Sequence, residues 1–112
     1  MEIILVNAFS INMLPGGNTL RFREIVHPED LILQNTLLRN AIGHPETDRV
    51  VRTLLEQGGA NIPPGERTNV VLEPGQALLV AQYKGPRLPE GATELPVGAK
   101  IEWWLVEQVT AL

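Results

Sequence analysis

The stretch "EIILVNAF", residues 2–9, starts with aliphatic and β-branched side chains and turns polar at Asn7. A run of this length and composition predicts a buried β-strand that ends near Asn7. "SINMLPGG", residues 10–17, follows it and predicts a short turn or helical turn, which Ser10 can cap and which Pro15-Gly16-Gly17 ends. Ligand sites of α/β proteins tend to lie beyond strand ends, so this strand end is a candidate binding region.

Working outward, three further segments predict strands. "TLRFREIV", residues 19–26, alternates apolar and charged side chains and predicts a half-exposed strand. "TNVVLEPGQALLVAQY", residues 68–83, predicts two strands joined by a turn at Pro74-Gly75. "KIEWWLVEQV", residues 100–109, predicts a closing strand whose two adjacent tryptophans point to opposite faces of the sheet.

Two segments predict helices of similar design. "HPEDLILQNTLLRNAIG", residues 27–43, has a proline and two acidic residues at its start, and Gly43 is its expected stop. "PETDRVVRTLLEQGG", residues 45–59, repeats this start and ends at a glycine pair. Its expected buried face consists of Val50, Val51, Leu54 and Leu55.

These segments amount to about five strands and two principal helices in the order β-β-α-α-β-β-β. The order indicates an α/β fold with a mixed sheet of about five strands and helices packed on it. A chain of 112 residues is expected to form a single small domain, residues 1–112. No internal repeat, low-complexity tract or linker divides it.

The composition excludes several classes of protein. The chain has no cysteine, which excludes disulfides, thiolate nucleophiles and cysteine-ligated zinc. No apolar run approaches the roughly 18 residues that a membrane span needs, and the first ten residues lack the basic start of a signal peptide. Thirteen acidic residues against nine basic ones argue against a protein that coats duplex nucleic acid. A small anionic ligand stays possible, because a few arginines can converge on one site.

The two histidines are the first candidates for chemistry. His27 and His44 are too far apart to form a helical metal pair, so no metal site and no cofactor are expected. Both precede a helix start, and on spacing alone a structural role there is the simpler interpretation. Of the two, His44 is slightly the better candidate for chemistry, because the preceding Gly43 permits positive φ and a sharp exposed corner. A ring at that corner would face the free amides of the following helix, where anions collect.

A second candidate lies in "KGPRLPEGATELPVGA", residues 84–99, which has three prolines and three glycines and is too long for a simple hairpin. Arg87 could clamp a phosphate there, and Glu90 could handle a proton. A solvated surface ion pair explains the same two residues. Asn7, Ser10 and Asn12 form the third candidate, for which helix capping and turn formation are the simpler explanation.

Three motifs, "NAFSINML" (7–14), "IGHPET" (42–47) and "RLPEG" (87–91), together favour a functional role for these candidates over a structural one. The chain resembles the viral anti-CRISPR ring nucleases over essentially its whole length. These are small dimeric proteins that degrade cyclic tetra-adenylate, the second messenger of type III CRISPR defence. "NAFS-x-NML" after a first strand is specific to the family, "IGH" supports the match, and "RLxEG" alone is weak. The proline- and glycine-rich segment after Glu90 departs from the family, whose archaeal viral members are more helical there.

The resemblance implies roles at matching positions. His44 corresponds to the catalytic histidine, Arg87 and Glu90 to the arginine and glutamate of "RLxEG", and Ser10 and Asn12 to residues that hold the ribose-phosphate ring. Asn7 and Gly43 complete the predicted substrate-binding set.

The implied reaction needs no metal and gives linear di-adenylate. The ribose 2′-hydroxyl attacks in line, Arg87 holds the phosphate and His44 donates a proton to the leaving 5′-oxygen, while Glu90 either orients the imidazole or acts as the base. The implied partners are cyclic tetra-adenylate and a second copy of the chain, related by a two-fold axis, in the host cytoplasm. Two alternatives stay open: a cyclic-nucleotide sponge or sensor that does not cleave, and a dimeric DNA-binding protein.

Overall fold

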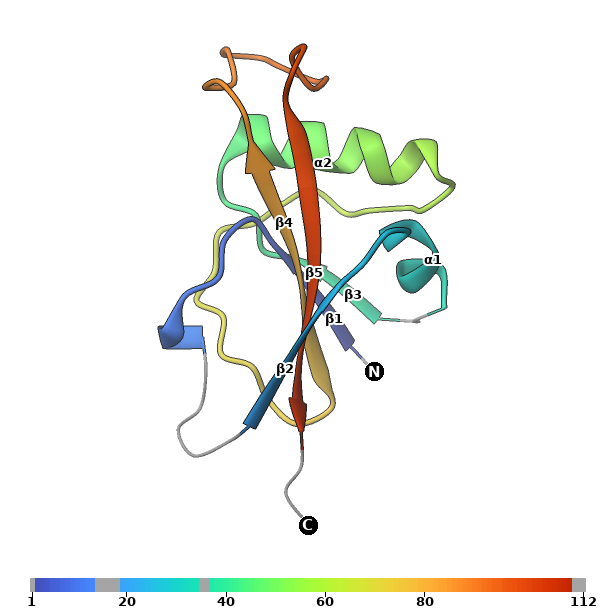
Figure 1. The fold of residues 1–112 in the computed structure, drawn as a ribbon, viewed down its shortest axis with the longest axis vertical. Helices are drawn as coiled ribbons and strands as arrows, with labels where there is room; N and C mark the ends of the chain where they lie inside the picture. The colour runs from blue at the N-terminus through green and yellow to red at the C-terminus, as the bar shows by residue number, and fades with distance from the viewer. Residues whose placement is uncertain (1, 14–18, 35–36, 110–112) are drawn as a thin grey trace.

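The computed structural model describes residues 2–13, 19–34 and 37–109, which form a five-stranded mixed sheet with both α-helices on one face (Figure 1). In chain order the elements are β1 (Glu2–Val6), the 3-10 turn η1 (Ile11–Met13), β2 (Thr19–Glu24), α1 (Pro28–Leu33), β3 (Leu37–Asn40), α2 (Pro45–Gln57), β4 (Gln76–Lys84) and β5 (Lys100–Val109). The strand order is β2-β5-β4-β1-β3. The predicted small single-domain α/β fold with a mixed sheet is confirmed.

The parallel part of the sheet decides where a site can form. β1 pairs in parallel with both β3 and β4, whereas β5 is antiparallel to β4 and to β2. α2 connects β3 to β4, which lie on either side of β1. The carboxyl ends of β1, β3 and β4 therefore meet at one edge of the sheet, and the segments that follow these three strands converge there.

The central strands β1 and β4 are buried on both faces of the sheet, which explains why β1 is a continuous apolar run rather than an alternating one. The face under the helices carries a core cluster that includes Ile3, Leu5, Ile32, Val51, Leu55, Leu79 and Leu105. The opposite face is covered by the irregular chain between α2 and β4 and carries Ile4, Val6, Val70, Leu72, Leu78, Val80 and Val106. Trp103 packs against the first cluster and Trp104 against the second, as predicted for neighbours on a strand.

The predicted helix over residues 27–43 is wrong beyond its first turns. It starts at Pro28 as expected but ends at Leu33, and Leu37–Asn40 form β3, which pairs with β1. The leucines of this segment fit a helical stripe by spacing, but parallel pairing with a buried strand satisfies their backbone groups instead. Gly43 is therefore not a helix stop, and the order of elements differs from the predicted β-β-α-α-β-β-β.

The predicted strand before Pro74-Gly75 is also absent from the described residues. The turn exists, with Gly75 at φ 82° and its carbonyl accepting the Glu2 amide, but residues 60–73 have no regular structure. Val70 and Leu72 are buried there as a cover over the sheet rather than as a paired strand. Val70 and Leu72 are buried on either side of the exposed Val71, so this apolar segment contributes to the core without pairing as a strand.

The strand ending near Asn7, the helix from Pro45 and the closing strand are all present. The predicted half-exposed strand from Thr19 is present as β2, but five of its six residues are exposed because it lies at the edge of the sheet. In α2, Val50, Val51 and Leu55 are buried as predicted and Leu54 is half-buried. The predicted end of the first turn at Pro15-Gly16-Gly17 lies outside the described residues. No helix in the described part of the chain is long and apolar enough to span a bilayer.

Candidate functional site

Two adjoining cavities lie where the carboxyl ends of the parallel strands converge, and His44 lines both of them. One, of about 320 Å³, is lined by Asn7, Ala41, Gly43, His44 and Arg67. The other, of about 460 Å³, is lined by His44, Glu46, Arg87, Leu88, Pro89 and Glu90. Figure 1 shows the start of α2 and the 85–99 loop at the same end of the molecule. The structure therefore brings together five of the seven predicted site residues: Asn7, Gly43, His44, Arg87 and Glu90.

His44 is the residue that begins α2. It is the N-cap, with φ −94° and ψ 114°, and its side chain makes no capping hydrogen bond to the helix backbone. The preceding element is β3, so the expected handover from one helix to the next is corrected to a strand-to-helix junction. The imidazole is 60% exposed, and its Nδ1 lies 3.4 Å from Glu46 Oε2 and 3.4 Å from Thr47 Oγ1. The ring thus contacts the first turn of α2 only through side chains at Nδ1, and most of it is exposed to a ligand.

Gly43 serves the site differently from the prediction. Its φ is not positive, so no left-handed corner precedes His44. A Cβ at Gly43 would lie 2.7 Å from Arg67 Cβ and 2.8 Å from Arg67 Cγ. Glycine is needed here because the aliphatic stem of Arg67 packs directly on the backbone, which places a cation in the cavity beside His44.

A buried polar network holds the segment that carries Arg67. Asn40, at the end of β3, donates from Nδ2 to Asp48 Oδ1 at 2.7 Å and to the Pro63 carbonyl at 2.9 Å. Asp48 Oδ2 accepts the Gly65 amide at 3.0 Å and Arg52 Nε at 3.1 Å. Both Asn40 and Asp48 are buried. The network ties β3, α2 and the 60–67 segment together and so positions two walls of the cavity.

The loop between β4 and β5 lines the other of the two cavities beside His44, the one of about 460 Å³. Leu88 is buried and anchors the loop, while Arg87 and Glu90 on either side of it are exposed. Glu90 makes no ion pair with His44 among the described residues; the carboxylate that contacts the imidazole is Glu46. The prediction that Glu90 could orient the ring therefore has no support from this geometry.

Two lysines stabilise the base of that loop. Lys84 Nζ and Lys100 Nζ lie 3.1 Å and 3.3 Å from the carboxylate of Glu102, on the last residues of β4 and the first of β5. The pKa of Glu102 lies below its ordinary value because Lys84 and Lys100 donate hydrogen bonds to the ionised carboxylate, and the bond from Lys84 has the larger effect. The pair from Lys84 joins the end of β4 to the start of β5, and the pair from Lys100 lies within β5.

Asn7 also borders a third hollow, which is largely apolar. This hollow of about 340 Å³ is lined by Asn7, Ala8, Phe9, Phe22, Val80, Gln82, Trp104 and Val106. Phe9 and Phe22 meet edge to face with their ring centroids 5.4 Å apart, and both are exposed. An aromatic surface thus adjoins the polar cavity at Asn7.

Ser10 and Asn12 do not line these three cavities. They lie at η1, where Ser10 Oγ accepts the Asn12 amide at 3.3 Å and the Ser10 carbonyl accepts the Met13 amide at 2.9 Å. This is the capping role that the sequence also predicted for Ser10.

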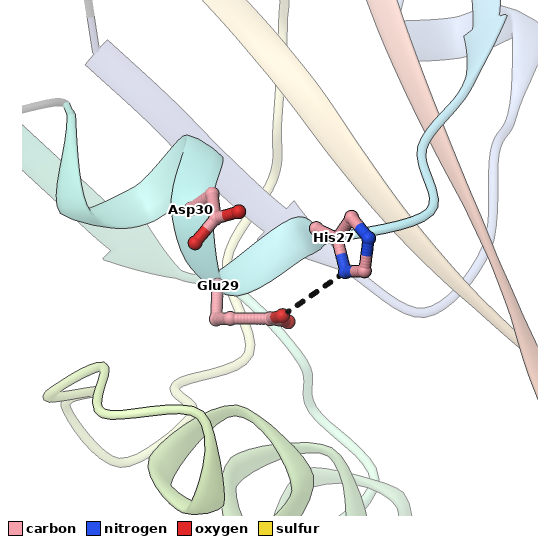
Figure 2. A group of neighbouring side chains, drawn as sticks. All are labelled: His27, Glu29 and Asp30. Atoms are coloured by element: carbon pink, nitrogen blue, oxygen red, sulfur yellow. Dashed lines mark ion pairs between the residues drawn. The ribbon is translucent and has the colours of Figure 1, made fainter.

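The other histidine belongs to a separate, solvent-facing group (Figure 2). His27, Glu29 and Asp30 place one potential metal-ligand atom each within 4.8 Å of one another. All three come from the first turn of the six-residue helix α1, and the His27 side chain is 70% exposed. In the described part of the chain no further such residue joins them.

Arg67 and Glu46 are the site residues that the sequence reasoning missed. Arg67 lies in "ANIPPGER", residues 60–67, where an arginine close after Pro-Pro-Gly resembles the proline- and glycine-rich segment of Arg87. Acidic residues are favoured in the first turn of any helix by the helix dipole. The position of Glu46 in the sequence therefore gives no indication of its contact with His44.

The fold and site define a small α/β protein with polar cavities at the carboxyl ends of its parallel strands. The chain belongs to the STIV B116-like family of viral proteins, whose model matches residues 3–97. It is similar to the solved structure of B116 of Sulfolobus turreted icosahedral virus, with a TM-score of 0.71 and 30% sequence identity. That match covers 95% of this chain and 98% of B116. Comparison with curated protein sequences gives no match.

Proposed function

We propose that this protein is a ring nuclease that cleaves cyclic tetra-adenylate into linear di-adenylate without a metal and so switches off type III CRISPR signalling in the host cytoplasm. The observation that carries the proposal is the position of His44, which lines both polar cavities and has an arginine in each. Arg67 and Arg87 suit the phosphates of a cyclic oligonucleotide, and Asn7 suits its ribose hydroxyls. Membership of a viral family is consistent with an anti-CRISPR role.

The proposed reaction uses only groups of this chain and of the substrate. The ribose 2′-oxygen forms a bond to the adjacent phosphorus, and the bond from phosphorus to the 5′-oxygen breaks. His44 gives its proton to the departing 5′-oxygen, and the 2′-hydroxyl proton leaves to Glu90 or to solvent. Arg87 neutralises the charge that accumulates on the phosphate oxygens. Two such cuts on opposite sides of the ring give two di-adenylates.

The proposed assembly is a two-fold homodimer, because a ring of four identical units can share the axis of the dimer. Each chain then contributes one His44 and makes one cut. The exposed pair Phe9 and Phe22 adjoins the polar cavity and supports a contact with a second copy, since aromatic side chains are enriched in protein interfaces.

A time course of cyclic tetra-adenylate cleavage in the presence of a chelator tests the proposal. The wild type is expected to produce di-adenylate, and His44→Ala is expected to bind the ring but lose cleavage by about 10²–10⁴-fold, the usual contribution of a general acid. His27→Ala is the matched control, because His27 also precedes Pro-Glu at a helix start but lies in a separate group. It should cleave at the wild-type rate.

Three results would contradict the proposal. An intact ring after prolonged incubation with the wild type would refute cleavage, and tight binding without product would identify a sponge or sensor instead. Steeply salt-dependent binding to duplex DNA, with no affinity for the ring, would favour a DNA-binding protein.

A further inference from the structure

The chain contains the sequence His-Pro-Glu twice, and each copy begins a helix. His27-Pro28-Glu29 starts α1 and His44-Pro45-Glu46 starts α2, with the histidine as N-cap in both. In each copy the glutamate approaches Nδ1 of the histidine, at 3.6 Å in the first and 3.4 Å in the second. The protein therefore provides its own comparison for the contact between His44 and Glu46.

The second copy differs from the first in its surroundings. Glu46 lines the same cavity as His44, Arg87 and Glu90, whereas His27 and Glu29 line none of the three cavities described above. Figure 2 shows Glu29 beside His27 and apart from that site. The Glu46 side chain is 18% exposed, and Thr47, which is buried, places its Oγ1 3.4 Å from the same Nδ1. Nδ1 of His44 therefore faces a carboxylate, which can only accept a hydrogen bond when ionised, and a hydroxyl, which can accept or donate one. Contacts of this length are common in unliganded catalytic sites and tighten when the ligand binds.

A carboxylate at one ring nitrogen determines which nitrogen is left for chemistry. An Nδ1–H that donates to a carboxylate fixes the tautomer and the orientation of the imidazole, and Nε2 is then the nitrogen that gains or loses a proton. Among the described residues Nε2 of His44 makes no hydrogen bond or ion pair, so it is available to a ligand in the cavity.

We infer that Glu46 is a positioning residue for His44: it accepts the Nδ1–H, so that Nε2 delivers the proton to the leaving oxygen. This inference rests on the proposed ring nuclease function. In the reaction the proton on Nε2 moves to the 5′-oxygen, and the neutral imidazole that results is the Nδ1–H tautomer that Glu46 stabilises. With Glu46 at Nδ1, Glu90 is left for the proton of the 2′-hydroxyl.

The tautomer of His44 provides a test that does not depend on activity. Imidazole ¹⁵N chemical shifts are measured well above neutral pH for the wild type, Glu46→Ala, Glu46→Gln and Glu29→Ala. In the wild type the Nδ1–H form of His44 should predominate, and Glu46→Ala should shift the population toward Nε2–H. Glu46→Gln should retain much of the wild-type population, because its amide oxygen still accepts a hydrogen bond. Glu29→Ala should leave His44 unchanged.

Cleavage rates complete the test. Glu46→Ala should lower the single-turnover rate on cyclic tetra-adenylate by about tenfold, part of the effect of a general acid, with the Kd for the ring unchanged. Glu46→Gln should fall between Glu46→Ala and the wild type, and Glu29→Ala should match the wild type. Losing one acid from a helix start changes stability only slightly, so these variants remain folded.

The outcomes separate the inference from the proposed function. A wild type that does not cleave the ring defeats the function, while the tautomer still shows whether Glu46 holds the imidazole. If the wild type cleaves but Glu46→Ala has the same tautomer or the same rate, Glu46 does not position His44. A loss of ring binding in Glu46→Ala, with the cleavage rate of bound substrate unchanged, would also overturn the inference.

Discussion

Removing the carboxylate of Asp48 should cost this protein a large share of its stability. Asp48 lies in the first turns of α2, buried, and accepts hydrogen bonds from Asn40 Nδ2, the Gly65 amide and Arg52 Nε. Asp48→Ala leaves the Gly65 amide without its acceptor and deprives Asn40 of its shorter bond. The polar ends of β3, α2 and the 60–67 segment then lose the group that joins them.

The magnitude follows from the environment of each bond. The bond from Asn40 is buried, the bond from Gly65 is partly buried, and both end on a charged acceptor, so each contributes about 1.5 kcal/mol. The pair with Arg52, whose side chain is 26% exposed, adds at most about 0.5 kcal/mol because solvent screens it. Asp48→Ala should therefore lower the free energy of unfolding by about 3 kcal/mol, out of about 5–15 kcal/mol for a domain of this kind. At about 4 °C per kcal/mol, the Tm should fall by about 12 °C.

Urea denaturation and calorimetry measure this loss. Glu56→Ala is the matched control, since Glu56 is exposed on the same helix, and it should stay within about 0.5 kcal/mol of the wild type. Asp48→Asn keeps one acceptor oxygen and should lose about half as much as Asp48→Ala. A double-mutant cycle with Asn40→Ala should give a coupling of about 1 kcal/mol. An Asp48→Ala variant as stable as Glu56→Ala would refute the assignment of the network as a tie between these elements.

Three further predictions concern the site and the loop that borders it. Arg67→Ala should raise the Kd for cyclic tetra-adenylate about tenfold by calorimetry, the loss expected for one charge-assisted contact, while leaving the Tm within about 4 °C; an unchanged Kd would remove Arg67 from the site. Gly43→Ala places a Cβ 2.7 Å from Arg67 Cβ and should cost about 1–3 kcal/mol in urea unfolding and weaken ring binding; a neutral effect on both would show that Arg67 moves freely. The lowered pKa of Glu102 implies stabilisation that is present above its unfolded value of 4.5 and is lost as pH falls through the folded value, because Lys84 and Lys100 favour the ionised form. Thermal melts at low salt should therefore show the wild type above Glu102→Gln near neutral pH, with the gap closing in acid; a gap independent of pH would contradict this cause.

Helix starts were predicted well and one helix end was not. The Pro-Glu starts at residues 28 and 45 depend on local backbone chemistry, namely a fixed φ and acids near free amides, and the structure has both helices there. The end of α1 and the existence of β3 depend on pairing with β1, more than thirty residues earlier in the chain. No local pattern distinguishes such a leucine-rich edge strand from the continuation of a helix.

The site shows the same division between local and distant causes. His44, Arg87 and Glu90 were selected by residue type and by the three motifs, and the structure gathers them around one cavity. Arg67 enters only because the backbone at Gly43 leaves room for its stem and because Asn40 and Asp48 hold its loop. Glu46 contacts the imidazole within the start of α2, whereas Glu90 reaches the cavity only through the fold of the 85–99 loop.

By itself the sequence determined the class of fold, both helix starts, the strand that ends at Asn7 and the candidate residues His44, Arg87 and Glu90. These follow from periodicity, from turn and cap chemistry and from a few motifs, all of which act within a dozen residues. Only the tertiary structure decided that Leu37–Asn40 is a strand and that Arg67 joins the cavity beside His44. Parallel pairing brings the ends of three strands to one edge of the sheet, and the chain must close over long separations before those side chains meet.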